Sequence, residues 1–587
     1  MALKPLLTGL MGLLFVLAGC SGEGGAPPAE SASDDAAASG LPVPLPSGTT
    51  AEINAEDLSV RIAALADDAF EGRAPGAPVG EKTAEWLAEE MARIGLAPAG
   101  EDGTWFQTVG MVEQTVDEAL SSLTFTGGLS ERDFPMQLGT DAVIWTKRQS
   151  ADTVAFDSSE VVFVGYGVVA PEYGWNDYEG LDATGKTVVM LVNDPGFATE
   201  DPEIFKGKAM TYYGRWTYKF EEAARQGAAA AILVHETEPA SYGWDVVSNS
   251  WSGAQADLVR ADGGDGRVAV EAWISQSAAR SLFADGGLDF EAMKDAAKAP
   301  DFKPVDMGGL TATGTITQTI DRLESRNVVG RIDGTVSPDE HVLFTAHWDH
   351  LGKKSGEKDG APGTDFYRDN IFNGAVDNAS GVASVLEIAE AMAQAPAERS
   401  GLFLFVTLEE SGLLGSAFYA ETPTVPLHQI VAGINMDAYR PVGPTKDMVV
   451  IGYGASELEP ILESVLAERD RTVRPDTKPE AGFFYRSDHV SFAKKGVPML
   501  YAKNGIDLLD GGESVGLAFE SAYTVQRYHK PMDEFGDDWD LSGLVEDVTV
   551  LHAVGQSIAQ SDTWPTWYAG NEFEAARQES LAAGGGR

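Results

Sequence analysis

Three apolar, strand-like stretches in the second half of the chain each end in carboxylates or a histidine. They are residues 341–349 (HVLFTAHWD), 402–410 (LFLFVTLEE) and 430–437 (IVAGINMD). In an open α/β sheet, binding sites form at the carboxyl ends of the strands, so these polar side chains are expected to meet at one edge. Histidine and carboxylate groups are typical zinc ligands. The pattern therefore predicts a metal site, and the number of ligands predicts two ions.

Two other segments complete the candidate set. Asp377 lies in the sequence GAVDNASG, between the first and second stretches, and His529 lies in the sequence YHKP. Each candidate alone has a simpler explanation: Asp377 opens a helical pattern that it could cap, and Glu409-Glu410 could be a solvated surface pair. The ordered set arises by chance far less often than any one member, so the pattern favours a metallohydrolase.

The charge of the chain excludes some partners. The formal net charge is −48 over 587 residues. Such a surface repels nucleic acid and anionic lipid headgroups, so neither is expected to bind it. The charge gives no information about the fold.

The N-terminus has the features of an export signal with a lipid-attachment site. Residues 5–18 are almost wholly apolar, and the sequence LAGC places small residues directly before Cys20, the only cysteine. This segment resembles the signals of bacterial lipoproteins, which are cleaved before the cysteine and acylated on it; a plain signal peptide is the alternative. We predict a signal peptide at 1–19 and a flexible tether at 20–48. The expected location is the bacterial cell envelope on a lipid anchor, facing the periplasm, with Ser21 favouring the outer membrane.

The chain is too long for one hydrophobic core, so two or three domains are expected. Residues 155–305 hold strand-like runs, one or two helical patterns and none of the candidate ligands, which predicts an inserted β-rich domain. From residue 325, strands alternate with helices, as in an α/β domain. The expected strands lie near 326–332, 341–347, 402–408, 430–436, 448–453 and 497–502, and the clearest helices at 381–394, 455–468 and 541–559. The predicted boundaries are 49–150 and 306–565 for the main domain, 151–305 for the insert and 566–587 for a disordered tail.

The order of the motifs resembles one known family. His-x-Asp, Asp-Asn-Ala-Ser-Gly, Glu-Glu, Asn-Met-Asp and Tyr-His follow one another as in the zinc aminopeptidases of family M28. Further agreement lies in residues 487–492, 496–498, 71–73 and 95–98, so the resemblance covers most of residues 50–560. The insert resembles a protease-associated (PA) domain, through residues 175–178 and 227–232.

The resemblance implies the metal ligands. One zinc ion would be held by His347 and Asp437, and the other by Glu410 and His529. Asp377 would bridge the two ions. Zinc is the metal that the family implies, and manganese or cobalt would suit the same ligands.

The resemblance also implies roles beside the metals. Glu409 would be the general base, and Asp349 would orient His347 through its second ring nitrogen. Tyr485 is a candidate donor to the oxyanion, with a place in the wall of a pocket as the alternative. The residues expected to support the site are His350, Ser487, Asp488 and His489.

The fold implied is α/β: a mixed-sheet zinc exopeptidase domain, phosphorylase/hydrolase-like, with an inserted PA-like domain. The implied activity is removal of N-terminal residues from peptides. A carboxypeptidase or dipeptidase acting on acidic peptides is the first alternative, with Arg368, Arg440 and Arg486 as possible carboxylate ligands. A glutaminyl-cyclase-like activity and a non-enzymatic, receptor-like ectodomain are two others. The insert could be a lid or a spacer, and the residue preference and oligomeric state are left open.

Overall fold

The computed structural model describes residues 40–353 and 370–584. The described residues from Leu41 onward belong to one compact unit. The predicted signal peptide, Cys20, most of the predicted tether and Arg368 therefore lie outside the described residues. No helix in the described part of the chain is long and apolar enough to cross a bilayer.

The part of the chain that carries the predicted ligands is built on a mostly parallel sheet. The central strand β14 (Ser337–His347) pairs in parallel with β17 (Arg399–Val406) and with β18 (Ile430–Asn435). On the outer side of β18, β21 (Met499–Asn504) is also parallel, whereas β13 (Val305–Ile332) runs antiparallel to β17. The inner strands are continuous apolar runs because helices cover both of their faces. The predicted α/β fold with a mixed sheet is confirmed.

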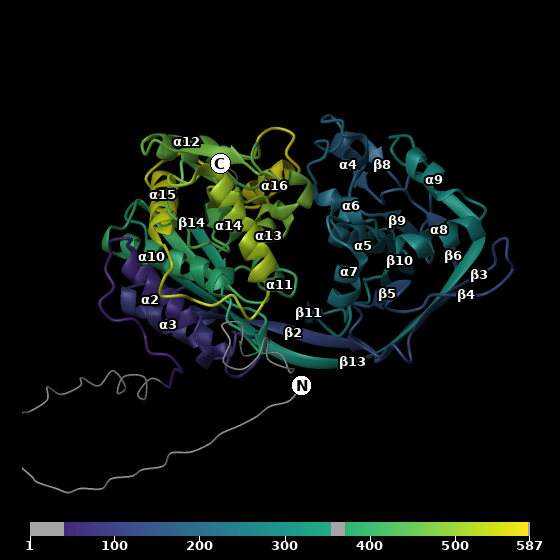
Figure 1. The fold of residues 1–587 in the computed structure, drawn as a ribbon, viewed down its shortest axis with the longest axis horizontal. Helices are drawn as coiled ribbons and strands as arrows, with labels where there is room; N and C mark the ends of the chain where they lie inside the picture. Colours follow the sequence, from purple (N-terminus) through teal and green to yellow (C-terminus); the bar gives the residue numbers. More distant parts are fainter. Residues whose placement is uncertain (1–39, 354–369, 585–587) are drawn as a thin grey trace, which may run out of the picture. The chain divides into compact units, whose positions relative to one another are not determined.

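Alternate residues of one strand enter different cores. Phe403 and Phe405 of β17 pack with helices on one face, whereas Leu402 and Leu404 pack with Tyr419 on the other. The helices of the first face, seen together in Figure 1, are α2 (Ala55–Leu65), α3 (Glu81–Ile94), α10 (Gly381–Gln394) and α15 (Ser542–Ala559). Those of the second face are α11 (Leu414–Glu421) and α13 (His489–Ala493).

One long strand, β13, belongs to two sheets. Its first half pairs with β3 (Ser122–Thr126) and β6 (Thr153–Phe163), and its second half pairs with β2 (Phe106–Val116) and β17. Figure 1 shows β13 and β2 running side by side from one part of the molecule to the other. The insert is thus joined to the main domain by paired strands rather than by flexible linkers.

The insert has its own parallel sheet. Strands β6, β9, β10 and β12 are parallel, and β5 pairs antiparallel at the edge. The bounds of four of these strands are β5 (Ala142–Trp145), β9 (Thr187–Leu191), β10 (Ala230–Val234) and β12 (Val270–Ile274). Since β3 and β5 precede residue 151 and the pairing of β13 with β6 continues to Thr317, this sheet extends beyond the predicted interval 151–305 on both sides.

The insert carries more helix than the one or two helices predicted. Among its helices, α5 covers one face of the sheet and α8 the other. The described helices of at least seven residues are α5 (Trp216–Arg225), α7 (Trp244–Ser250), α8 (Gln276–Asp285) and α9 (Phe290–Ala296). The prediction of a β-rich insert is therefore wrong. Its helices were missed because short helical segments between polar breaks leave a weak periodic signal.

The predicted disordered tail is wrong for residues 566–584. Trp567 and Phe573 are buried, and the chain ends in α16 (Glu574–Ala583). The Trp567 indole N–H donates to Gly496 O at 2.8 Å, and the buried guanidinium of Arg577 donates to Ile430 O at 3.0 Å. These few large side chains hold a segment whose average composition predicts fraying.

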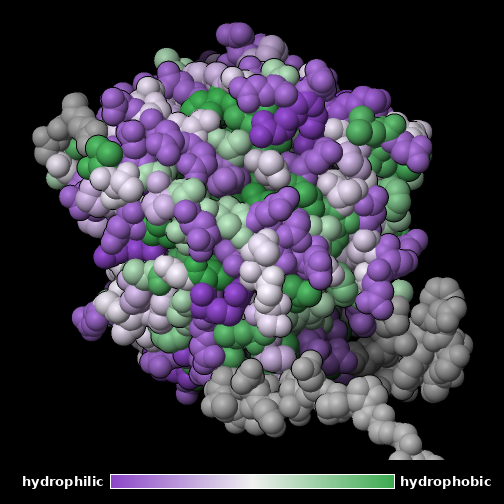
Figure 2. Space-filling model, turned by 90° about the vertical axis from the view of Figure 1, so that its left-hand side faces the viewer, coloured by the Kyte–Doolittle hydropathy of each residue, from purple (hydrophilic) through white to green (hydrophobic). Residues whose placement is uncertain are grey.

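Most of the surface seen in Figure 2 is hydrophilic, with small scattered hydrophobic patches. One helix departs from this pattern: α14 (Gly512–Gln526), which sequence reasoning did not predict, exposes Val515, Leu517, Phe519 and Val525. Its weak helical periodicity explains why the pattern missed it.

Candidate metal centre

The predicted ligands meet at the carboxyl edge of the parallel strands. His347 is the last residue of β14, and Asp437 lies two residues beyond the end of β18. Glu410 lies four residues beyond β17. Asp377 lies in the segment Ala375–Ser380, where its own backbone is not helical, directly before α10, and His529 follows α14. Five side chains from distant parts of the sequence are thus brought to one place.

Asp377 presents one carboxylate oxygen to each of two histidines. Its Oδ1 lies 3.3 Å from Nε2 of His347, and its Oδ2 lies 3.3 Å from Nε2 of His529. The backbone N–H groups of Val376 and Asp377 donate to the buried carboxylate of Asp533, each at 3.1 Å, and fix the turn. The Asp377 carboxylate thus presents one oxygen to each histidine.

The first side of the centre is formed by His347, Asp377 and Asp437, whose ligand atoms lie within 4.8 Å of one another. Oδ1 of Asp437 lies 3.7 Å from Nε2 of His347. The other oxygen, Oδ2, accepts hydrogen bonds from the Ser487 hydroxyl at 2.7 Å and from the Tyr501 hydroxyl at 3.0 Å. These donors hold Asp437 so that its free oxygen faces the histidine.

The second side contains one more histidine than the sequence implied. Glu410 Oε2 lies 3.0 Å from Nε2 of His529, and its Oε1 lies 2.6 Å from Nδ1 of His350. The ligand atoms of His350, Asp377 and Glu410 also lie within 4.8 Å of one another. The sequence placed His350 only among the supporting residues, although it directly follows the His-x-Asp motif.

Metal analysis of two variants tests which of the two histidines, His350 or His529, is a metal ligand. His529→Gln is expected to lower the metal content to about one ion per chain, because Nε2 of His529 faces both Asp377 and Glu410. His350→Gln is expected to retain two ions with about 10- to 100-fold weaker binding of one of them, since it acts by orienting Glu410. Metal content after dialysis against a weak chelator checks both; the reverse order of loss would make His350 the ligand.

Glu409 lies beside the group formed by His347, Asp377 and Asp437 but is not part of it. Its Oε2 is 3.9 Å from Nε2 of His347, and burial, together with the nearby carboxylates, raises its pKa well above the usual range. The Glu409 backbone N–H donates to Asp349 Oδ1 at 3.1 Å. The prediction for Asp349 needs a correction: its backbone carbonyl, at 3.1 Å, contacts Nδ1 of His347, whereas the carboxylate is 3.7 Å away. The carboxylate instead holds the turn that carries Glu409.

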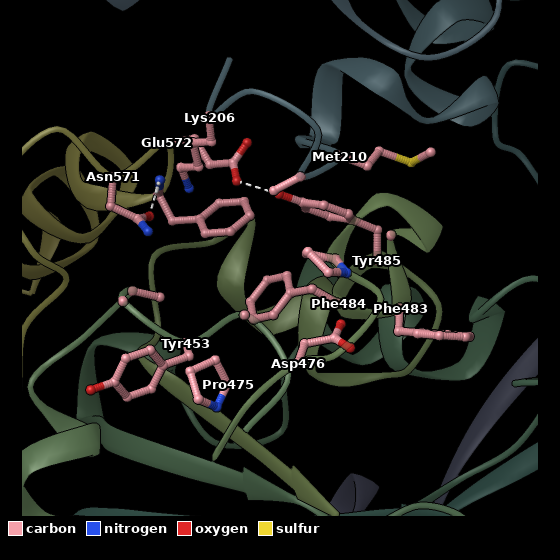
Figure 3. Close-up of a pocket in the computed structure, with 17 residues that line it drawn as sticks. Lys206, Met210, Tyr453, Pro475, Asp476, Phe483, Phe484, Tyr485, Asn571 and Glu572 are labelled. Carbon is pink, nitrogen blue, oxygen red and sulfur yellow. Dashed lines mark hydrogen bonds between the residues drawn. The ribbon is translucent and has the colours of Figure 1, made fainter. Parts of the chain in front are cut away.

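The structure does not place Tyr485 at the metal centre. Its hydroxyl donates to Glu572 Oε1 at 2.6 Å, inside a separate cavity that Tyr485 helps to line (Figure 3). Its predicted role as oxyanion donor is therefore wrong, and the alternative, a pocket wall, describes its position. The pair is non-local in sequence, so the motif pattern gave no sign of it.

Three other tyrosines line the cavity at the metal centre, and one of them, Tyr501, is the donor to Asp437. Tyr523 and Tyr528 share this cavity of about 370 Å³ with Asp377, Glu409 and Asp437. The Tyr528 ring stacks on that of His529, with centroids 3.9 Å apart. The Tyr-His motif was used in the sequence only for its histidine, so the tyrosine was missed.

Arg73 ties together the loops that carry the ligands. This fully buried guanidinium donates to the backbone carbonyls of Leu65, Trp348 and Gly374, at 2.8 to 3.0 Å. Burial lowers its pKa to about 10, against the attraction of Asp377 and other carboxylates. It is the third residue of the Glu-Gly-Arg motif in residues 71–73, to which the sequence gave no function.

Arg73→Met is expected to lower the free energy of unfolding by about 2–4 kcal/mol, because several buried carbonyls would lose their donors. Denaturant unfolding of the wild type and the variant would measure it. Arg280→Met, at an exposed arginine of the insert paired with Glu291, is the matched control and should change stability little. Equal effects of the two variants would contradict the structural role of Arg73.

The residues present fit a pair of zinc ions. Imidazole nitrogens and carboxylate oxygens are the ligands that zinc takes at such sites, and one shared carboxylate allows two ions. Burial alone would lower the pKa of His347, but Glu409, Asp377 and Asp437 raise it well above the usual range. Carboxylates gathered at one buried place thus create a strong demand for cations.

Fold and site together define an α/β protein with a histidine–carboxylate cluster suited to metal binding at the carboxyl edge of its sheet. Residues 327–552 match the family model described as Peptidase family M28. This segment contains every ligand named above and Glu409, but neither Arg73 nor the insert.

Two curated proteins that are similar to part of this chain have names that describe them as aminopeptidases. The chain is 26% identical over 366 residues to "Leucine aminopeptidase 2" of Arthroderma otae, covering 57% of this chain and 60% of that protein. It is 24% identical over 310 residues to "Leucine aminopeptidase 2" of Trichophyton rubrum, covering 48% and 56%. The chain thus spans less than two thirds of the length of these relatives. Among solved structures, an aminopeptidase from Aneurinibacillus sp. strain AM-1 is 18% identical, with a TM-score of 0.46 and coverage of 87% of this chain and 96% of that one.

Proposed function

We propose that this protein is a two-zinc exopeptidase that removes N-terminal residues from peptides. The observation that carries the proposal is Asp377, whose two carboxylate oxygens face two different histidines, His347 and His529. This arrangement lies within the segment that matches the M28 peptidase model. The aminopeptidase names of the relatives support the choice of substrate end.

The reaction follows from the placement of Glu409. When bound, the two ions would polarise the peptide carbonyl and lower the pKa of water. Glu409 takes a proton from the attacking water and returns it to the leaving amine. Glu409 lines the same cavity as Asp377 and Asp437, which places its carboxylate where the attacking water would lie. Tyr528, in the same cavity, is the proposed hydrogen-bond donor to the developing oxyanion in place of Tyr485.

A peptide series tests the choice between exopeptidases. The protein from residue 21 onward is expected to cleave peptides with a free N-terminus one residue at a time, and to leave acetylated peptides intact. Cleavage that ignores acetylation but requires a free C-terminus would make it a carboxypeptidase. No cleavage in either series, with two ions bound, would contradict the peptidase proposal and favour the receptor-like alternative.

We also propose that the mature protein is held at a bacterial membrane by a lipid on Cys20. The support is the LAGC sequence after an apolar segment. Cys20→Ala is expected to block incorporation of labelled palmitate and to move the protein from the membrane fraction to the soluble fraction. Unchanged membrane association of the variant would contradict the anchor. The PA-like identity of the insert likewise stays a proposal.

A further inference from the structure

The cavity at the metal centre is lined by a guanidinium that lies over the Phe483 ring, 5.5 Å from its centroid, and that has two nitrogens without a hydrogen-bond partner in the described part of the chain. Arg486 lines the cavity together with Asp377, Glu409 and Asp437. Its Nε and Nη2 are buried, and neither has a hydrogen-bond partner among residues 40–353 and 370–584. Asp488, two residues further along the chain, forms no ion pair with it in the described structure. Leaving a buried charged donor unsatisfied is costly, so an absent acceptor is indicated.

The other cations that line this cavity have no buried nitrogen that lacks a hydrogen-bond partner among the described residues. Arg440 and Lys478 both contact Glu520, at 3.4 and 3.6 Å. Lys503 lies over the ring of Tyr501, 5.0 Å from its centroid, much as Arg486 lies over that of Phe483, but among the described residues it has no buried nitrogen that lacks a hydrogen-bond partner. In a chain with 90 acidic and 42 basic residues, carboxylates are in excess, yet none in the described part pairs with Arg486. The wall that carries Arg486 is therefore suited to an anion from outside.

A second arginine near Arg486 comes from the insert and has one buried nitrogen without a hydrogen-bond partner among the described residues. Nε of Arg215, just before α5, is buried and has no hydrogen-bond partner in the part of the chain that the structure describes. Burial, followed by repulsion from Arg486, lowers the pKa of Arg215 to about 10. The insert reaches the segment that carries Arg486 through Met210, whose N–H donates to Pro479 O at 3.2 Å. Arg215 does not line the cavity itself, but its positive charge, close enough to repel that of Arg486, favours negative charge beside Arg486.

We propose that Arg486, with electrostatic support from Arg215, binds a carboxylate of the substrate. The inference rests on the proposed peptidase function and names its substrate class: short peptides that present a free carboxylate close to the bond that is cut. A planar guanidinium binds a carboxylate through two parallel hydrogen bonds, which gives both affinity and orientation. The carboxylate can be the C-terminus of a dipeptide or the side chain of an acidic residue. The insert then shapes substrate choice through Arg215.

The experiment compares four peptides that share an N-terminal leucine: Leu-Ala free acid, Leu-Ala amide, Leu-Glu amide and Leu-Gln amide. In the wild type, kcat/KM for a carboxylate-bearing peptide is expected to exceed that of its neutral partner by about tenfold or more. Preference for Leu-Ala acid identifies the C-terminus as the bound group, and preference for Leu-Glu amide identifies the side chain. Arg486→Gln should abolish the preference with little change for the neutral peptides, and Arg486→Lys should restore part of it.

Arg280→Gln, at the exposed surface of the insert, is the matched control and should keep the preference. Calorimetric binding of Leu-Ala acid and amide to Glu409→Gln protein, with and without Arg486→Gln, gives a second readout that needs no turnover. Equal rates and equal binding of acid and amide by the wild type would overturn the carboxylate site while leaving the peptidase function standing. No cleavage of any of the four peptides would count against the peptidase function itself, and binding would then decide the carboxylate site alone.

Discussion

Glu409→Gln is expected to lower kcat by about a hundredfold or more while leaving both metal ions in place. The glutamine keeps the size of the side chain but cannot take a proton from water. Metal binding should persist because Glu409 Oε2 lies 3.9 Å from His347 and outside both groups of close ligand atoms. Steady-state hydrolysis of a leucine peptide, together with metal analysis of the same sample, measures both effects.

The adjacent residue provides the control. Glu410→Gln should lower the metal content, because Glu410 contacts His529 at 3.0 Å and His350 at 2.6 Å. If Glu409→Gln loses metal and Glu410→Gln keeps it, the base and the ligand have been exchanged in this account. Retention of full activity by Glu409→Gln would remove it from the reaction altogether.

Asp377→Asn is expected to lower activity by about a thousandfold or more, because bound ions supply several kcal/mol of transition-state stabilisation. The amide has one oxygen instead of two and no charge, so it cannot serve both His347 and His529. Both ions should bind more weakly, which metal analysis would show as loss on dialysis. A variant that keeps two tightly bound ions would contradict the bridging role.

Asp533→Asn is the graded control for Asp377. Asp533 accepts the backbone N–H groups of Val376 and Asp377, and within the described part of the chain it forms no ion pair with a histidine. Loss of such a supporting contact typically costs about 10- to 100-fold in metal affinity or activity. An effect as large as that of Asp377→Asn would mean that the turn, rather than the shared carboxylate, determines metal binding.

The core of the fold was predictable because its signal is local. The strands expected near 341–347, 402–408 and 430–436 coincide with β14, β17 and β18, whose apolar runs are long and continuous. The 28-residue strand β13 was predicted only at its end, since its pairing changes from one sheet to another along its length. Such a change depends on distant partners that no short window of sequence contains.

The metal ligands were predictable for a related reason: each follows a strand or precedes a helix in a recognisable motif. The residues that failed or were missed depend on tertiary contacts. Tyr485 was assigned to the site by proximity in sequence, but its hydroxyl is bound by Glu572, which lies 87 residues away. Arg73 acts through backbone carbonyls, which leave no mark in the pattern of residue types. Arg486 was named from the sequence only as one of three possible carboxylate ligands, and its two buried nitrogens without a hydrogen-bond partner among the described residues are visible only in the structure.

The C-terminal segment was also predicted wrongly because its order depends on tertiary contacts. Residues 566–584 were expected to be disordered from their small and polar composition, yet Trp567 and Phe573 are buried. Two aromatic side chains and a buried arginine outweigh the average of their neighbours. Composition predicts disorder reliably only where such anchoring residues are absent.

The most direct test of the central claim is a metal titration of the chelator-stripped protein, with peptide hydrolysis and metal content measured at each step. Hydrolysis is expected to be absent without metal, to rise as zinc is added and to level off at two ions per chain. Asp377→Asn is expected to show no such rise at the same zinc concentrations. Full activity in the stripped protein, or a plateau at one ion that Asp377→Asn also reaches, would contradict a centre in which one carboxylate bridges two catalytic ions.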